Sequence, residues 1–313
     1  LIRRPQDSGQ FSGTVVVETL NNARDYDWAF IWGLSAEYYM GRGDVFVAVT
    51  HNPSAIRALK EFDPIRYGEL YFANPTPNET CGRFDAPSDS EEGLKWDMIS
   101  QVGGLLRSST GPLAGFDVSR LYATTHTREL MTYANSVHKY TRLADGGHVY
   151  DGFVMKSEYA EVDRISRCSV TPEEGDPRRI IRNAGVPVIR VTAQGDVFNT
   201  WSVRRDDNDE TGDFYRLWEV AGAPHMDSIY YDNMPTLQDQ MRAGQQGFIA
   251  NWPMAYACTP DIELLDFPVM RHAMNAAFAA LENWSRNGMA PPRAQRINLS
   301  NGGISLNSVG LNV

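Results

Sequence analysis

Three polar residues, well separated along the chain, are of the types that perform nucleophilic hydrolysis. Thr127 lies in "TTHTRE", Asp196 in "VTAQGDVFN" and His225 in "WEVAGAPHMD". A hydroxyl is a weak nucleophile until an imidazole accepts its proton, and a carboxylate fixes the tautomer of that imidazole. If the fold brings these three side chains together, they predict acyl transfer.

Each of these residues comes after a segment typical of a buried β-strand. Compact apolar runs rich in β-branched residues predict six strands, near residues 13–22, 44–53, 118–124, 149–155, 186–196 and 214–222. Helical segments alternate with them, the clearest at 90–108 and 268–288. This alternation predicts a mostly parallel sheet covered by helices on both faces. The chemistry of such open sheets sits at the carboxyl ends of the strands.

Chain length and patterning favour one domain. The chain has 313 residues, of which 42% are hydrophobic, and this is enough to bury a sizeable core. We expect a single α/β domain over residues 1–313, with insertions at about 68–90, 156–184 and 226–266 where the sequence is loop-like or mixed.

Charge and hydropathy argue against two classes of partner. The formal net charge is −10, whereas binding to nucleic acid rests on clustered Lys and Arg. No run approaches the roughly 18 apolar residues that a membrane helix needs. The chain opens with "LIRRPQDSG" and lacks an initial Met, so we expect a mature or trimmed N-terminus. The expectation is a soluble protein, secreted if an upstream signal has been removed.

The sequence contains no metal or redox motif. Cys81, Cys168 and Cys258 form no CxxC pair, and there is no HExxH and no glycine-rich phosphate loop. We therefore expect no metal site and no cofactor. The three cysteines fit one disulfide with one free thiol as well as they fit three buried thiols.

Longer phrases carry a resemblance that runs through most of the chain. They include "RRPQDSGQFSGTVVVETLN", "RGDVFVAVTHNP", "SEEGLKWDMISQVGGLLRS", "LMTYANSVH" and "RLWEVAGAPHMD". On these phrases the chain resembles the α/β-hydrolase superfamily, in the branch labelled alpha/beta hydrolase domain proteins, most of them presumed serine esterases. The resemblance implies an α/β-hydrolase fold with lid-like insertions and hydrolysis of a small-molecule ester through an acyl-enzyme. The order nucleophile, acid, histidine is also the order expected of this superfamily.

The segment that should carry the nucleophile departs from the family in two ways. The family's third strand runs into Gly-x-Ser-Gln-Ser; aligned on "LYAT", Thr125 takes the Gly place, Thr127 the Ser place and Arg128 the Gln place. Aligned on the helix "LMTYAN", the sequence is short by about three residues. Three interpretations stay open: Thr127 is only a helix N-cap worth ~1 kcal/mol, Thr127 is the nucleophile, or residues such as Ser-Gln are missing from this sequence.

The resemblance also assigns the other parts of the site. It implies that Asp196 is the acid and His225 the histidine of a triad. An oxyanion hole needs the backbone N–H that follows the nucleophile and a donor from the loop after the first strand. A pocket for apolar acyl or alcohol groups needs aromatic side chains near the strand ends. The candidates are Arg128, Asn21 and Asn22 for the oxyanion hole, and His126, Trp201 and Trp252 for the pocket.

Several other charged residues have a structural interpretation. Glu219 lies inside the sixth predicted strand, so we expect a buried hydrogen-bond partner. The run from residue 204 to residue 209 is strongly charged, and we expect its members to face solvent: Arg204, Arg205, Asp206, Asp207 and Asp209.

Two functions follow from these observations. The first is a carboxylic ester hydrolase that uses the hydroxyl of Thr127 with Asp196 and His225. The second is a catalytically impaired binding protein with the same fold, because the usual serine is absent from the segment after the third strand.

Overall fold

The computed structural model describes residues 1–21, 27–81, 88–156, 160–227, 229, 233, 238, 241, 269–300 and 303–305. Its centre is an eight-stranded sheet with the strand order β1-β3-β2-β4-β5-β6-β8-β7. In chain order the strands of the sheet are β1 (Ile2–Arg3), β2 (Thr14–Thr19), β3 (Val45–Val49), β4 (Arg120–Thr125), β5 (Gly152–Lys156), β6 (Val188–Ala193), β7 (Asn208–Glu210) and β8 (Asp213–Val220). The six central strands pair in parallel, which confirms the predicted mostly parallel sheet.

Helices connect the strands, as the alternating pattern predicts. The α-helices are α1 (Phe30–Arg42), α2 (Pro53–Phe62), α3 (Pro64–Tyr67), α4 (Leu94–Arg107), α5 (Glu129–Ser136), α6 (Val197–Thr200) and α9 (Val269–Asn287). Short 3₁₀ turns are η1 (Ser8–Gln10), η2 (His138–Tyr140), η3 (Pro177–Arg179), η4 (Gln194–Asp196) and η5 (Trp201–Val203). No helix in the described part of the chain is long and apolar enough to cross a membrane.

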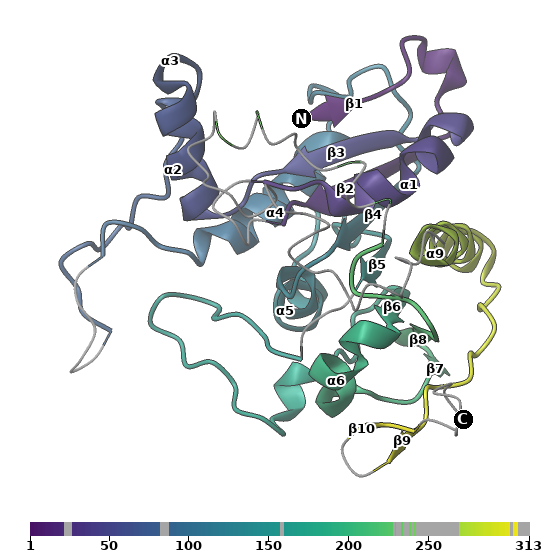
Figure 1. Cartoon of the computed structure of the whole chain (residues 1–313). Coiled ribbons are helices and arrows are strands. Elements are labelled where there is room, and N and C mark those ends of the chain that lie inside the picture. Colours follow the sequence, from purple (N-terminus) through teal and green to yellow (C-terminus); the bar gives the residue numbers. More distant parts are fainter. Residues whose placement is uncertain are drawn as a thin grey trace.

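The core has two layers because the sheet buries both of its faces. Successive residues of a strand point to opposite faces, so Val15 and Val17 of β2 join one apolar cluster and Val16 joins the other. The first cluster includes residues of α4 and α5, and the second includes residues of α1 and α9. The two pairs of helices accordingly lie on opposite sides of the sheet (Figure 1).

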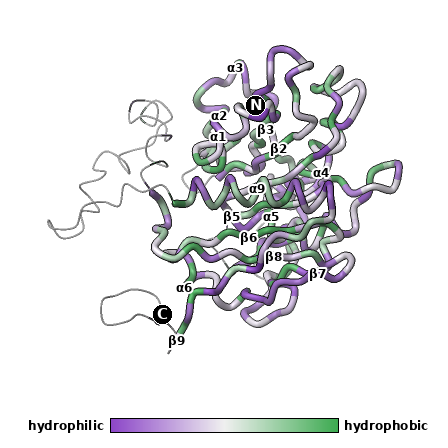
Figure 2. The backbone as a smooth tube through the Cα atoms, turned by 90° about the vertical axis from the view of Figure 1, so that its right-hand side faces the viewer, coloured by the Kyte–Doolittle hydropathy of each residue, from purple (hydrophilic) through white to green (hydrophobic). Residues whose placement is uncertain are grey.

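The last long helix, α9, closes the second layer. Its buried side chains form one stripe, made by Met270, Met274, Ala277, Phe278, Leu281 and Trp284. This spacing of three and four residues is the amphipathic pattern of a helix with one face on a core. Figure 2 shows hydrophobic and hydrophilic residues alternating along α9 where it crosses the strands.

The sequence pattern does not predict the two edge strands, β1 and β7. β1 pairs antiparallel with β3, and β7 pairs antiparallel with β8. Both are very short, and β7 consists of three polar residues, "NDE". Short polar edge strands protect a sheet from pairing with other chains. They also lack the apolar run by which a strand is recognised in a sequence.

The charged run beside β7 is only partly exposed, so the expectation that it faces solvent is wrong for two members. Arg205 is buried and binds Asp213 at 2.9 Å (Nη1 to Oδ2). The Asp207 side chain is also buried and binds Arg296 at 2.6 Å (Oδ1 to Nη2). A charge withdrawn from water needs a partner of opposite sign, and here β8 and the segment after α9 supply those partners.

The prediction for Glu219 is confirmed. Its two oxygens accept hydrogen bonds from Arg204, at 2.6 Å and 2.5 Å. The backbone N–H of Ile297 also donates to it, at 2.8 Å. Glu219 therefore ties β8 to the C-terminal segment, which continues into the antiparallel pair β9 (Leu299–Ser300) and β10 (Gly303–Ile304).

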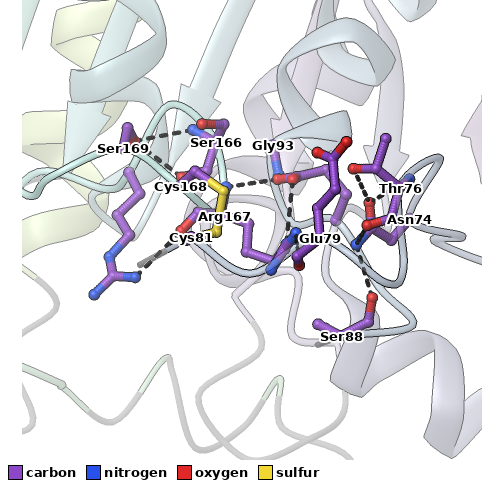
Figure 3. Close-up of a disulfide and its surroundings, with 12 residues drawn as sticks. Asn74, Thr76, Glu79, Cys81, Ser88, Gly93, Ser166, Arg167, Cys168 and Ser169 are labelled. Carbon is purple, nitrogen blue, oxygen red and sulfur yellow. Dashed lines mark hydrogen bonds and ion pairs between the residues drawn. A yellow bond between two sulfur atoms is a disulfide. The ribbon is translucent and has the colours of Figure 1, made fainter. Parts of the chain in front are cut away.

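A disulfide joins two of the segments expected to be insertions. Cys81 and Cys168 are bonded across 87 residues of sequence, and Cys258 lies outside the described residues. Beside the disulfide, the Arg167 side chain donates to the Glu79 carbonyl at 2.9 Å, and the Arg167 N–H donates to Glu91 at 2.8 Å (Figure 3). The covalent bond and its flanking hydrogen bonds hold these two loop-rich segments together.

Candidate active site

The carboxyl ends of four neighbouring strands converge on one edge of the sheet. β4, β5, β6 and β8 are parallel and adjacent in the sheet order. The chain leaves them at Thr125, Lys156, Ala193 and Val220. Residues 125–129, which we call the elbow, therefore lie on the same edge as residues 194–196 and 221–225, which we call the acid–histidine loops.

Asp196 and His225 are paired in the acid–histidine loops. The distance between Asp196 Oδ1 and His225 Nδ1 is 2.5 Å. The Asp196 carboxyl is buried, whereas 46% of the His225 side chain is exposed. Since a carboxylate only accepts hydrogen bonds, this contact gives the proton of the neutral ring to Nδ1 and leaves Nε2 able to accept one. The sequence places these residues 29 positions apart, and the topology brings them together as predicted.

Short backbone contacts hold the two acid–histidine loops against each other. The Gly195 N–H donates to the Ala223 carbonyl at 3.1 Å, and the Gly222 N–H donates to the Gln194 side chain at 2.9 Å. A Cβ atom on Gly195 would lie 2.9 Å from the backbone nitrogen of His225. Only glycine permits this approach, so the position of the imidazole depends on the absence of a side chain at residue 195.

The electrostatics of the pair favour an ionised acid. Burial alone would raise the pKa of Asp196, but the positive charge of Lys156 and the hydrogen bond from His225 lower it below its usual value. The carboxylate form is also the form that stabilises a neighbouring imidazolium. An ionised carboxylate therefore faces Nδ1 of the His225 imidazole.

The elbow is more enclosed than the acid–histidine loops. Thr127 is buried, and its Oγ1 lies 2.7 Å from the Oγ1 of Thr125. Thr125 in turn lies 2.9 Å from the hydroxyl of Thr19 on the adjacent strand β2. A hydrogen bond with the Thr127 side chain also lowers the pKa of Glu129. These contacts direct the Thr127 hydroxyl toward the sheet and α5.

Thr127 does not have the positive φ of a left-handed backbone. The nucleophile of an α/β-hydrolase sits on a sharp, strained turn between strand and helix. Among the residues that the structure describes, Asn183 is the only non-glycine residue with a positive φ, so Thr127 has an ordinary backbone conformation. Nor is Thr127 the helix cap: α5 begins after Arg128, and no side chain caps it.

His126 is the elbow side chain that faces the acid–histidine loops. Its ring centroid lies 5.5 Å from that of His225 and 4.3 Å from that of Phe30. Its Nε2 is 2.8 Å from the ammonium nitrogen of Lys156. Burial, followed by the charges of Lys156 and His225, holds the pKa of His126 well below its usual value. His126 is therefore a neutral, buried part of the site floor.

Glu129 and His51 form a second buried pair behind the elbow. Glu129 Oε1 lies 3.7 Å from His51 Nε2. Burial would raise the pKa of Glu129, but the contact and charge of His51, the charge of Lys95 and the hydrogen bond to Thr127 lower it to about 2. This pair links the first turn of α5 to the residues that follow β3.

The residues predicted to donate to an oxyanion make other contacts in the structure. The Asn21 backbone N–H donates to the Trp28 carbonyl at 3.0 Å, and the Asn21 side chain donates to the His126 carbonyl at 3.3 Å. Both donors therefore already have partners, and Asn22 lies outside the described residues. The Arg128 side chain turns away to Asp163 and Glu161, at 2.6 Å and 2.7 Å. Its backbone remains at the start of α5, where an oxyanion donor belongs.

Lys156 is a part of this site that the sequence reasoning missed. It ends β5 and is fully buried. Besides His126, its Nζ contacts Asp196 Oδ2 at 3.3 Å and the His225 carbonyl at 3.0 Å. The available signal was one charged residue ending an apolar strand, "YDGFVMK", between the two strands that lead to the elbow and to the acid.

The sequence predicts that two tryptophans line a pocket for the substrate. Trp201 is 55% exposed on η5, just after the Asp196 turn, and Trp252 lies outside the described residues, as does most of the segment 226–266. A cavity of about 470 Å³ opens elsewhere, near the amino end of β3, and is lined by Arg3, Arg4, Pro5, Gln10, Trp32, Met40, Gly41, Arg42, Gly43 and Asp44. Within the described residues, no group of three or more His, Cys, Asp or Glu could hold a metal ion.

Comparison with known proteins agrees with this architecture. A family model described as "Alpha/beta hydrolase domain" matches residues 1–313. No curated protein matches the chain. The sheet with its parallel strands and flanking helices is that of an α/β-hydrolase, and the family indicates a hydrolase-type function. The match extends over every residue of the sequence, so the chain belongs to the alpha/beta hydrolase domain family.

Proposed function

We propose that this protein is a carboxylic ester hydrolase in which Asp196 and His225 activate the hydroxyl of Thr127. The observation that carries the proposal is the Asp196–His225 contact of 2.5 Å at the carboxyl edge of the sheet. This pair supplies an oriented base beside the segment that carries the nucleophile in this fold. The family membership supports a hydrolase-type reaction at this edge.

The proposed reaction has two steps. His225 Nε2 accepts the proton of Thr127 Oγ1 while Oγ1 bonds to the ester carbonyl carbon; collapse of the adduct releases the alcohol, which takes the proton from His225. Water then attacks the acyl-threonine, again through His225, and releases the carboxylic acid and the free hydroxyl. The Arg128 backbone N–H is the proposed donor to the developing oxyanion.

One local movement is required before the first step. The Thr127 hydroxyl must exchange its contact with Thr125, now 2.7 Å long, for one with His225. Rotation about χ1 between staggered positions is a small change for a threonine side chain. The methyl group of Thr127 must then take another position in the elbow, which makes threonine a slower nucleophile here than serine would be.

The activity is tested with short-chain p-nitrophenyl esters and the variant His225→Ala. We expect kcat/KM to fall on the order of ten-thousandfold, because the hydroxyl loses its base. His272→Ala is a matched control, since His272 is an exposed residue of α9 and its loss should leave kcat/KM within about twofold. Full activity in folded His225→Ala protein would refute the proposal.

A second function is favoured by the geometry of the elbow. Thr127 is bonded to Thr125 and has no strained backbone, as expected of a binding protein that keeps the fold without the chemistry. A fluorophosphonate probe separates the two functions, because only an activated hydroxyl is phosphonylated. Trypsin cuts after Arg120 and Arg128, so the adduct would appear on the peptide 121–128, "LYATTHTR". Absence of any adduct in folded protein supports the binding protein.

A further inference from the structure

Lys156 occupies the centre of the candidate site without being exposed to it. It is the last residue of β5, which lies between β4 with its elbow and β6 with its acid loop. The preceding residues of the strand are buried and apolar, and the Lys156 side chain itself has no exposed surface. A lysine so placed cannot serve solubility, and its position calls for a specific role.

The contacts of Lys156 join all three parts of the site. Its Nζ is 2.8 Å from His126 Nε2 in the elbow, 3.3 Å from Asp196 Oδ2 and 3.0 Å from the backbone carbonyl of His225. An ammonium group has three N–H donors and no acceptor. Three acceptors from three different segments thus surround it, and one of them carries a full negative charge.

Physical chemistry limits what such a group can do. Burying an ammonium costs several kcal/mol unless an opposite charge and further hydrogen bonds compensate it. Asp196 provides the opposite charge, and the positive charge of Lys156 in turn lowers the pKa of Asp196. The two oxygens of the carboxylate are then distinguished: Oδ1 faces His225 Nδ1 at 2.5 Å and Oδ2 faces Lys156. Rotation of the carboxylate would break both contacts.

We propose that Lys156 is the positioning residue of this site, whose ammonium fixes the Asp196 carboxylate and the His225 backbone and holds His126 as a neutral hydrogen-bond acceptor. The functional part rests on the proposed ester hydrolysis, whereas the geometric and electrostatic part stands independently of it. Lys156 does not touch the substrate. It orients the base, and its charge adds to the effect of burial in keeping His126 neutral.

The proposal predicts an electrostatic effect that a purely structural lysine would not have. The charged or titratable groups that face His126 among the described residues are Lys156 and His225, and Asp196 lies beyond them. Removing the ammonium removes a positive charge and the N–H that occupies Nε2, and both losses favour the protonated ring. The pKa of His126 should therefore rise toward its usual value, by about one unit, although burial still keeps it low.

The test uses the variants Lys156→Met, which keeps the length of the side chain, and Lys156→Gln, which keeps a neutral donor. Histidine-selective NMR titration of ¹⁵N-labelled protein is readable because the chain has only six histidines. The expected result is a rise of about one pH unit in the titration midpoint of His126 in Lys156→Met, and a smaller rise in Lys156→Gln, which loses only the charge. Lys95→Met is the matched control: Lys95 is also buried, but it binds Asp163 at 2.6 Å, so its loss should leave the His126 titration unchanged.

Kinetics provide the second measurement. Misplacing the base should lower kcat on the order of a hundredfold, whereas KM should change less than about threefold because Lys156 makes no substrate contact. If the wild-type protein hydrolyses no ester, the proposed function fails, yet the NMR titration still decides the role of Lys156. An unchanged His126 titration in a folded variant overturns the proposal.

A measurement on the wild-type protein does not depend on whether the variants fold. Heteronuclear spectra of the lysine ammonium groups should show one slowly exchanging ammonium with a nuclear Overhauser contact to a histidine ring, as the 2.8 Å contact requires. Absence of such a signal under conditions in which the buried Lys95 ammonium is visible would also overturn the proposal.

Discussion

The two sides of the candidate site differ in the contacts and exposure of the side chains proposed to react. In the acid–histidine loops, Asp196 and His225 are already 2.5 Å apart and the imidazole is 46% exposed. In the elbow, the Thr127 hydroxyl is buried and points to Thr125. The acid–histidine pair is thus already formed, whereas the hydroxyl of the proposed nucleophile is hydrogen-bonded to another residue.

The difference comes from how each side is built. The acid–histidine loops need two side chains from two strand ends and one close backbone approach at Gly195, and all of these are present. The elbow needs a strained turn of fixed length, and here the link from β4 to α5 is only residues 126–128, without a glycine. The link of three residues does not give Thr127 a positive φ, whereas the contacts of the acid–histidine loops are formed.

Among the variants of the acid–histidine loops, the largest effect on ester hydrolysis is expected from Asp196→Asn. An amide donates to Nδ1 of His225 and selects the wrong tautomer, so ester hydrolysis should fall on the order of ten-thousandfold. Asp145→Asn is the control, since Asp145 is exposed and accepts the N–H of Gly147 within its own turn. Steady-state kinetics with p-nitrophenyl acetate give the ratio. A loss of less than tenfold would mean that the pair is not the base.

A smaller effect is expected from Gly195→Ala. The new Cβ would lie 2.9 Å from the nitrogen of His225, so the histidine loop must move by several tenths of an ångström. Misplacing a base by this kind of shift costs on the order of a hundredfold in kcat. Gly104→Ala on α4 is the matched control, because nothing lies within 4 Å of its Cβ position. Equal activity in the two variants would show that the imidazole is not tightly positioned.

The sequence predicts features whose signal is local, but not features that depend on residues far apart in the chain. Each central strand carries its own apolar run, and the parallel topology then places Asp196 and His225 on one edge. The burial of Lys156 depends on partners 30, 40 and 69 residues away, and a single lysine after an apolar run looks like an exposed strand end. The pairing of Cys81 with Cys168 likewise rests on an approach of two distant loops.

On the elbow side, the expected effect is on stability rather than on activity, and it comes from the buried acid Glu18. Glu18 of β2 precedes Thr19, whose hydroxyl bonds to Thr125, and Glu18 accepts the N–H groups of Ile31 and Trp32, each at 2.9 Å. Burial outweighs these hydrogen bonds and raises the pKa of Glu18 to about 8. The folded protein therefore retains a proton that the unfolded chain releases near pH 4.5.

The sign of the pH dependence follows from this difference. A raised pKa of an acid stabilises the fold at low pH, and the stabilisation is lost as the pH rises from about 4.5 to about 8. Urea unfolding of wild-type protein between pH 5 and pH 8 should therefore show a decline that Glu18→Gln lacks, on the order of a few kcal/mol. Glu92→Gln, at an exposed position, should follow the wild-type decline. Parallel curves for wild type and Glu18→Gln would mean that Glu18 is ionised in the folded state. A buried charge would then lie behind the elbow, as that of Asp196 does in the acid–histidine loops, beside Lys156.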